Sequence, residues 1–266
     1  MYAFKYHRAT SVNEAAAMSA KSADAKILAG GQSLVQAMKL RLAHPTDLID
    51  LGGLGDLKSL KAEGNAVVIG AMVRHAEVAA SSSVKKAIPA LAALVGTIGD
   101  RQVRNMGTIG GSLANSDPAA DYPAAVVGLG ATITTNKGKH EADRFFKGLF
   151  ETALSQGEVI TSVSFPAPKR AAYMKFKNPA SRFAIVGVFV ADFGGGNVRV
   201  AVTGAGGCAF RQAEMEKALA AKFDPSSVAG IKVSDKGLNS DLHASAEYRA
   251  HLVTVMAKRA VEAAMK

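Results

Sequence analysis

Two short stretches of the chain combine adjacent glycines with a hydroxyl side chain, a composition suited to binding phosphate. The first is LAGGQSL (residues 28–34), and the second is GTIGGSLANSDPAADYP (residues 107–123). Bare glycine backbone lets main-chain N–H groups approach an anion closely, and a serine hydroxyl adds a further donor. Two such stretches in one chain predict a ligand with two phosphates, and a dinucleotide meets that requirement.

The elements predicted around the first stretch would position these donors. Residues 26–29 are predicted to form a strand, and Ser33 is predicted to be the N-cap of a helix over residues 34–40. A strand, a glycine turn and a helix N-terminus would bring several backbone donors to one point. The glycine spacing is not GxGxxG, so the sequence does not indicate a Rossmann domain.

The rest of the N-terminal part alternates short strands and helices, with the second glycine stretch predicted as a turn. A capping box from Ser11 to Glu14 opens an alanine-rich helix. Two further helices are predicted between residues 75 and 95, separated near 81–83, and a third over 118–129. The predicted strands are 2–8, 48–51, 66–69, 131–135, 139–142 and 159–165, with a hairpin turn at 136–138.

The pattern changes after the sequence FPAP, which ends at Pro168. Strands are predicted over residues 172–177, 185–192 and 198–203, and helices over 211–221 and 245–265. This order predicts a small C-terminal unit with a three-stranded antiparallel sheet and covering helices. The boundary between the two parts is expected near residue 168.

Composition limits the classes of protein that the chain can belong to. Its 266 residues, 48% of them hydrophobic, suffice for a large core without disulfide or metal. The single cysteine, Cys208, excludes an internal disulfide or a cysteine-ligated cluster held by this chain alone, and favours a reducing, cytoplasmic setting. No secretory signal or membrane-spanning run is expected.

The net charge of +10 raises the question of nucleic acid. The basic residues are scattered, however, and aromatic residues make up only 6% of the chain. We therefore expect a solvated basic surface, or one that docks an acidic partner subunit, and no nucleic-acid binding. The histidines His44, His140, His243 and His251 lack metal-ligand spacing, so no metal site is predicted. No catalytic nucleophile motif occurs.

The two glycine stretches, about eighty residues apart, resemble those of the flavin-binding medium subunits of molybdenum hydroxylases. This family includes the carbon monoxide dehydrogenase medium chain and is related to the FAD domain of xanthine dehydrogenase. AGGQSLVQAMKLRLAHPTDLIDL is similar to the first FAD loop with its following helix and strand, and RNMGTIGGSLANSDPAADYPAA to the second. FFKGLFETAL, GEVITSVSFP and KFKNPASRFAIVGV follow in the family's order, so the resemblance covers essentially the whole chain.

The resemblance implies an α+β fold and a role in electron transfer. It implies an FAD-binding domain of the PCMH type with two subdomains at residues 1–168, and a C-terminal flavoprotein domain at residues 169–266. The chain would carry FAD, as an oxidoreductase component, between a small subunit with [2Fe-2S] clusters and an external acceptor. A large subunit with molybdopterin would act on the substrate, in a dimer of heterotrimers. The alternatives are a stand-alone FAD-dependent oxidoreductase and a nucleotide-binding regulatory module without redox activity.

Positions in the matching motifs imply which residues contact FAD. The implied residues are Ala29, Gly30, Gly31, Gln32, Ser33, Leu34, Ile98, Thr108, Gly110, Gly111, Ser112, Asn115, Asp121, Ile160 and Lys177. Ser112 stands where the family often has Asn, and Gln32 where it often has His; both keep hydrogen-bonding capacity.

Several of these roles have a structural alternative. Asp121 matches an acidic FAD contact, but together with Asp117 it could instead cap the local helix or turn. Lys177 matches a lysine near the flavin ring that would raise its potential, but could be an exposed strand lysine. His75 and Arg74 could contact the cofactor or cap a surface helix, and Phe183 could shield the flavin or pack in the C-terminal domain.

Overall fold

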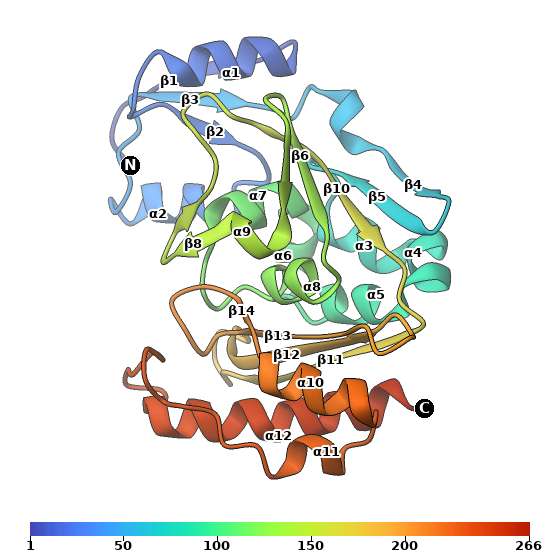
Figure 1. Ribbon diagram of the computed structural model, residues 1–266. Helices are drawn as coiled ribbons and strands as arrows, with labels where there is room; N and C mark the ends of the chain where they lie inside the picture. Colours follow the sequence, from blue (N-terminus) through green and yellow to red (C-terminus); the bar gives the residue numbers. More distant parts are fainter.

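The computed structural model describes residues 1–266, which form three units that follow one another along the chain. Figure 1 shows the N-terminal unit at one end, a central sheet with helices, and the C-terminal sheet with helices on its outer face. Separate sheets and helices of this kind confirm the predicted α+β class.

The N-terminal unit is a parallel sheet in the order β1-β3-β2. Its strands are β1 (Lys5–Arg8), β2 (Lys26–Leu28) and β3 (Asp47–Asp50), connected through helices α1 (Val12–Ala20) and α2 (Leu34–Lys39). Ser11 caps α1 as predicted, because its Oγ accepts a hydrogen bond from the Glu14 amide at 3.1 Å. The Glu14 carboxylate accepts from the amide and hydroxyl of Thr10 rather than from the Ser11 amide.

The central unit contains an antiparallel sheet in the order β4-β5-β10-β6-β7. The strands are β4 (Leu60–Glu63), β5 (Ala66–Gly70), β6 (Thr132–Thr135), β7 (Lys139–Glu141) and β10 (Ile160–Pro166). The predicted β6–β7 hairpin is confirmed. Strand β4 was not predicted, because this edge strand is mostly exposed and has no alternating apolar pattern.

Six helices of the central unit follow β5. They are α3 (His75–Ala80), α4 (Ser82–Ala87), α5 (Pro89–Gly96), α6 (Arg101–Met106), α7 (Ile109–Asn115) and α8 (Tyr122–Gly128). The prediction of two helices between residues 75 and 95 is wrong, because Ser81 caps α4 and Pro89 opens a separate α5. Short elements complete the unit: η1 (Gly55–Lys58), α9 (Ala142–Phe145), β8 (Phe146–Gly148) and β9 (Glu151–Thr152).

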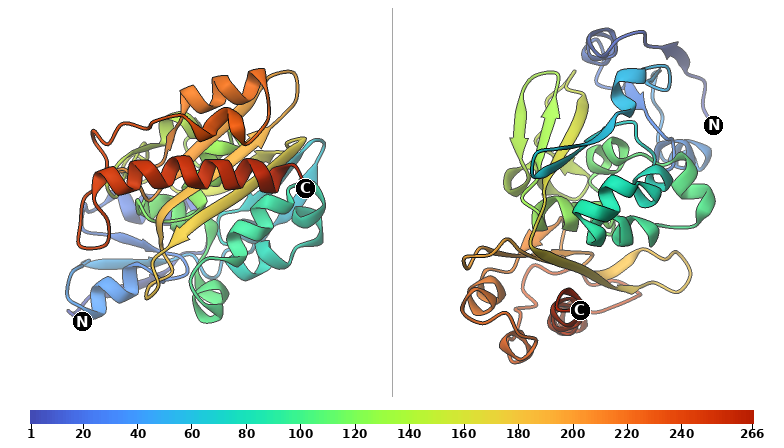
Figure 2. Two further views of the ribbon diagram at one scale, coloured as in Figure 1. Left: turned by 90° about the horizontal axis from the view of Figure 1, so that it is seen from below. Right: turned by 90° about the vertical axis from the view of Figure 1, so that its right-hand side faces the viewer.

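The C-terminal unit is an antiparallel sheet in the order β11-β12-β13-β14, covered by helices. The strands are β11 (Arg170–Lys177), β12 (Ala184–Asp192), β13 (Val198–Thr203) and β14 (Phe210–Arg211); the helices are α10 (Ala213–Ala221), α11 (Ser226–Ala229) and α12 (Ala246–Ala264). The three predicted strands are confirmed, and the two-residue β14 makes the sheet four-stranded. Figure 2 shows α12 lying across the outer face of this sheet.

The largest apolar cluster, of 32 buried residues, joins the central unit to the inner face of the C-terminal sheet. Phe189 of β12 belongs to it, and a Cβ on Gly128 of α8 would lie 2.8 Å from the Phe189 ring. Helix α8 therefore packs directly on β12. None of the helices has the length and apolar character needed to cross a membrane.

Candidate cofactor site

The first glycine stretch connects β2 to α2 and passes very close to the segment that precedes α7. A Cβ atom on Gly30 would lie 2.0 Å from the carbonyl oxygen of Met106, so only glycine fits at this position. Gly31 has a φ of +72°, a left-handed conformation that glycine adopts without steric cost. Both glycines are thus required by the path of the backbone.

The main-chain N–H groups of this stretch are free. From Gly30 to Leu34, none of the five amides donates a hydrogen bond to a main-chain carbonyl. Ser33 occupies the N-cap position of α2 as predicted, but its side chain makes no capping hydrogen bond. Consecutive free amides beside the start of a helix are a donor set that suits a phosphate.

The second glycine stretch was predicted to be a turn, but in the structure its two glycines, Gly110 and Gly111, belong to the first turn of helix α7. Thr108 is its N-cap, and its Oγ accepts from the amide of Gly111 at 3.3 Å. The amide of Gly110 donates to the carbonyl of Ala71 at 2.9 Å, and that of Ser112 to the carbonyl of Thr108 at 3.0 Å. These amides are therefore already used, which corrects the prediction that both stretches offer free backbone donors.

The two stretches nevertheless lie side by side, as their predicted common role requires. A Cβ on Gly111 would lie 3.4 Å from the Cβ of Ala29, and Gly30 contacts the backbone of Met106 and Gly107. Gly110 is also needed for packing, because its Cβ would lie 2.6 Å from that of Ala71. The structure thus combines free amides on the first stretch with the hydroxyl groups of Thr108 and Ser112 on the second.

Asp121 is bound by two protein groups, one on each carboxylate oxygen. It is buried, its Oδ1 accepts from the Tyr173 hydroxyl at 2.5 Å, and its Oδ2 lies 3.0 Å from the Lys175 ammonium. Burial raises the pKa of the Asp121 carboxyl, and Lys175 and Tyr173 oppose that rise. Direct contact of Asp121 with a cofactor stays a prediction, because each carboxylate oxygen keeps a further acceptor site. Asp121 itself makes no capping hydrogen bond, whereas Asp117 accepts from the amide of Ala119 at 2.9 Å.

The two lysines of β11 differ in burial, because the Lys175 side chain is only 6% exposed and Lys177 lies on the surface. The role of Lys177 near the flavin ring stays a prediction. Lys177 is exposed at the end of the strand, after a shift in register. The Lys175 ammonium also donates to the carbonyls of Thr97 and Arg182, at 3.1 Å and 3.0 Å. Sequence reasoning missed Lys175, because a lysine between Met174 and Phe176 on an alternating strand is expected to face solvent.

His75 packs against the start of the second stretch. Its amide donates to the Gly107 carbonyl at 2.9 Å, and a Cβ on Gly107 would lie 2.5 Å from its ring Nε2. The ring packs 5.3 Å from that of Tyr122. Burial, helped by the Arg104 guanidinium, lowers the pKa of His75 to about 4, so the ring is neutral at neutral pH. Arg74 is the N-cap residue of α3.

The remaining predicted contacts belong to several elements. Ile98 is half-buried after α5, and its carbonyl accepts from Arg104 at 2.8 Å. Asn115 ends α7, and Ile160 is buried at the start of β10. Gln32 and Leu34 belong to the first stretch. Phe183 is 48% exposed in the loop between β11 and β12, so the packing alternative does not apply to its ring.

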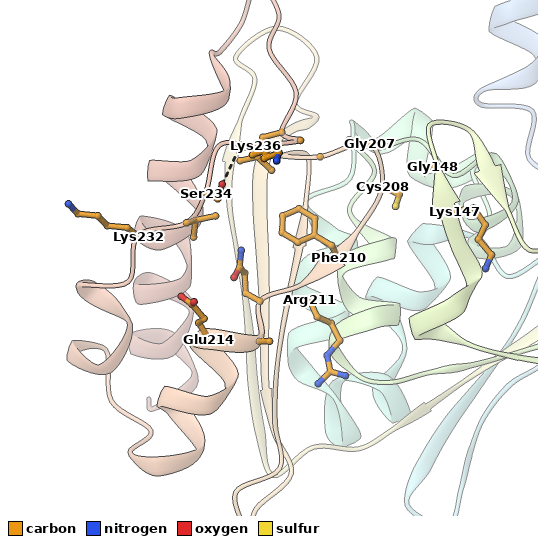
Figure 3. A pocket seen from close by; sticks show the side chains of 16 residues that line it. Lys147, Gly148, Gly207, Cys208, Phe210, Arg211, Glu214, Lys232, Ser234 and Lys236 are labelled. Atoms are coloured by element: carbon orange, nitrogen blue, oxygen red, sulfur yellow. Dashed lines mark hydrogen bonds between the residues drawn. The ribbon is translucent and has the colours of Figure 1, made fainter.

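A separate open cleft of about 650 Å³ lies in the C-terminal unit (Figure 3). Figure 3 shows Lys147 and Lys232 on its opposite sides, with Phe210, Arg211 and Cys208 between them. None of the predicted cofactor residues lines it. The chain has no group of three or more metal-ligating side chains.

Comparison with known proteins agrees with this arrangement. Residues 2–168 match the family described as FAD binding domain in molybdopterin dehydrogenase. The chain is 36% identical to the nicotine 6-hydroxylase medium subunit of Paenarthrobacter nicotinovorans, over 97% of this chain and 96% of that protein. It is also 36% identical to the carbon monoxide dehydrogenase medium chain of Hydrogenophaga pseudoflava, over 98% and 96%.

A solved structure is similar over the same length. The reconstituted CO dehydrogenase from Oligotropha carboxidovorans has a chain that matches with a TM-score of 0.91 and 34% identity, covering 99% of this chain and 98% of that one. The fold, the paired glycine stretches and the sequence therefore agree. The chain belongs to the family of FAD-binding medium subunits of molybdenum hydroxylases.

Proposed function

We propose that this chain binds FAD without a covalent link, with the diphosphate on the first glycine stretch. The observation that carries this proposal is the run of free amides from Gly30 to Leu34, set against the start of α7. Ala29 and Gln32 complete the wrap around the diphosphate and the ribityl chain. Such an array of N–H groups fits a diphosphate without a lysine or a metal ion.

The other proposed contacts follow from their positions around this stretch. Thr108 and Ser112 offer hydroxyl groups, while Gly110 and Gly111 allow α7 to pack closely enough to present them. Ile98, Asn115 and Ile160 are proposed as further contacts of the cofactor. Lys177 is proposed to lie near the flavin ring, and Lys175 is a positioning cation that acts through Asp121.

The chain is the FAD-carrying electron-transfer subunit of a molybdenum hydroxylase complex. Its relatives are named as medium subunits, and a similar solved structure, 34% identical over 98% of this chain, is a Cu,Mo-CO dehydrogenase. The large subunit would hold the molybdopterin and the small subunit the [2Fe-2S] clusters, since Cys208 alone cannot ligate a cluster. Bound FAD would supply the redox chemistry between those clusters and an external acceptor, and this chain would bind and orient it.

Three finer statements belong to the same proposal. The complex is a dimer of heterotrimers, and it works in the cytoplasm. The FAD-binding domain covers residues 1–168 and a C-terminal flavoprotein domain covers 169–266; the family match that ends at residue 168 supports this boundary.

The test is to purify the chain and titrate it with FAD, using the flavin absorption near about 450 nm as the readout. Gly30→Ala forces the first stretch away from Met106. Loss of one hydrogen bond to a charged phosphate costs about 1.5–3 kcal/mol, so affinity should fall at least about tenfold.

Gly55→Ala is the matched control, because nothing lies within 4 Å of its added Cβ. It should bind FAD as the wild type does. A wild-type chain that takes up no FAD, or a Gly30→Ala variant with unchanged affinity, would refute the proposed site.

A further inference from the structure

The hairpin between β8 and β9 has an unusual tip. Gly148 pairs with Glu151, so Leu149 and Phe150 alone form the turn. Their side chains are 65% and 59% exposed. Tight turns of this kind normally carry Asn, Asp or Gly, so two large apolar residues at the tip need an explanation.

The backbone of this tip is strained as well as apolar. Phe150 has a φ of +54°, a region in which a bulky side chain is an outlier. A residue of the second glycine stretch holds this backbone in place, because the Phe150 amide donates to the Ser116 carbonyl at 3.2 Å. Ser116 itself has a φ of +47°. Strain of this kind persists where the surrounding structure fixes it, and it is concentrated at functional sites.

The tip forms one wall of a cleft of about 360 Å³ that has further apolar residues around it. Phe183, 48% exposed, lies on another wall. Leu149, Phe150 and Phe183 are the apolar rim of this cleft. An exposed group of large apolar side chains is typical of a protein-binding surface.

The cleft contains one ion pair, and its remaining carboxylate is hydrogen-bonded to the backbone. Arg249 is buried and lies 2.7 Å from Asp241, and Asp117 accepts from the amide of Ala119 at 2.9 Å. No lysine lines the cleft, although the chain has 32 lysines and arginines. The surface is therefore suited to an uncharged, apolar part of a partner rather than to an acidic one.

We propose that the apolar rim is the docking surface for the partner subunit that delivers electrons, with the Leu149–Phe150 tip inserted into an apolar hollow of that subunit. This inference rests on the proposed function. The tip is hydrogen-bonded to Ser116, directly after α7, and the cleft continues along residues 117–119. A protein seated on the rim lies next to the cofactor site. Because the Leu149–Phe150 tip is convex and more than half exposed, it fits into a concave protein surface better than it fits against a flat cofactor ring.

The test uses the FAD-loaded chain and the iron–sulfur subunit that co-purifies with it from its own cells. The variant Leu149→Asn/Phe150→Gly replaces the tip with residues that suit the turn, so the free energy of unfolding should stay unchanged or rise. Affinity for the partner should fall about tenfold or more, as is typical of a truncated hot spot, while FAD affinity stays the same. Met265→Ser, at a residue that is 50% exposed on the C-terminal unit, should change neither affinity.

Several outcomes would overturn this inference. Unchanged partner affinity of the double variant would do so, as would a loss of FAD affinity with partner binding intact, which would assign the tip to the cofactor. Phe183→Ser lies outside the hairpin and gives an independent measure if the double variant folds poorly; unchanged partner affinity in that variant would equally count against the docking surface. If wild-type chain binds FAD but no iron–sulfur subunit co-purifies, the proposed function itself fails.

Discussion

Lysine 175 reaches three segments around the candidate site with a single ammonium group. Its Nζ lies 3.0 Å from Asp121, 3.1 Å from the Thr97 carbonyl and 3.0 Å from the Arg182 carbonyl. These segments follow α5, lead into α8, and join β11 to β12. One cation therefore determines the relative positions of three loops that border the site.

Removing this cation should destabilise the fold more than its position on a strand would suggest. Lys175→Met leaves the Asp121 carboxylate buried with only the Tyr173 hydroxyl as partner. Breaking a buried ion pair from one side costs about 3–5 kcal/mol, and we expect a loss in this range in urea unfolding.

Two companion variants test the cause of that loss. Lys177→Met removes an exposed lysine from the same strand and should change the free energy of unfolding by less than about 0.5 kcal/mol. Adding Asp121→Asn to Lys175→Met removes the unpaired charge and should recover part of the stability. If Lys175→Met and Lys177→Met were equally mild, the ion pair would have no role in positioning the loops.

The residues predicted best are those whose identity is determined by the backbone conformation alone. Gly30 and Gly31 could be recognised from the sequence, because close approach and a positive φ require glycine in any context. Asp121 and Lys177 could not be assigned in the same way. Their roles depend on which side chains the fold brings together, and Lys175 and Tyr173 are more than fifty residues from Asp121 along the chain.

At the level of elements, α3 and the start of α7 are joined through His75, and this contact should respond to pH. The pKa of His75 is about 4 in the folded chain against an ordinary value of 6.5. Between these values the unfolded chain binds the proton and the folded chain does not, so stability falls as pH falls. From pH 7 to pH 5 the expected loss from this group is about 2 kcal/mol.

The variant His75→Phe isolates this contribution. Phenylalanine keeps an aromatic ring against Gly107 and Tyr122 but cannot take up a proton. Urea unfolding at pH 7 and pH 5 should therefore show a smaller loss for the variant, by about 2 kcal/mol. Equal losses in both proteins would show that His75 is not the titrating group.

The accuracy of the predicted elements depended on whether a periodic apolar pattern was present. Strands β12 and β13 were predicted almost to their ends, because their residues are apolar and β-branched and most are buried. Helix α7 was missed because glycines at its start indicate a turn, whereas here they allow contact with Ala71 and Ala29. Tertiary packing thus overrides the low helix propensity of glycine.

At the scale of the whole molecule, the central and C-terminal units share one apolar core. Residues 1–168 alone would lack Phe189 and its neighbours on β12 and β13, which pack in the same cluster as Tyr122 and Val126 of α8. We expect this fragment to show no cooperative thermal transition and to aggregate, because burial of helix α8 is lost.

The control for this truncation is the full chain with a protease site inserted near residue 168, cut after purification. Both halves remain present, so the shared core should keep them together through gel filtration, with a cooperative transition. A fragment 1–168 that melts cooperatively near the temperature of the full chain would show that the two parts fold independently. The pattern change near residue 168 was visible in the sequence, but the shared core was not, since it depends on which sheet face is covered.

The free amides from Gly30 to Leu34 have a practical consequence for work with the apoprotein. Backbone dipoles recognise the shape and charge of a tetrahedral oxyanion, not the nucleotide attached to it. Sulfate or inorganic phosphate in a purification buffer therefore competes for the same place. Reconstitution is best begun in a medium free of both salts, since precipitation with ammonium sulfate would leave the chain preloaded with the competitor.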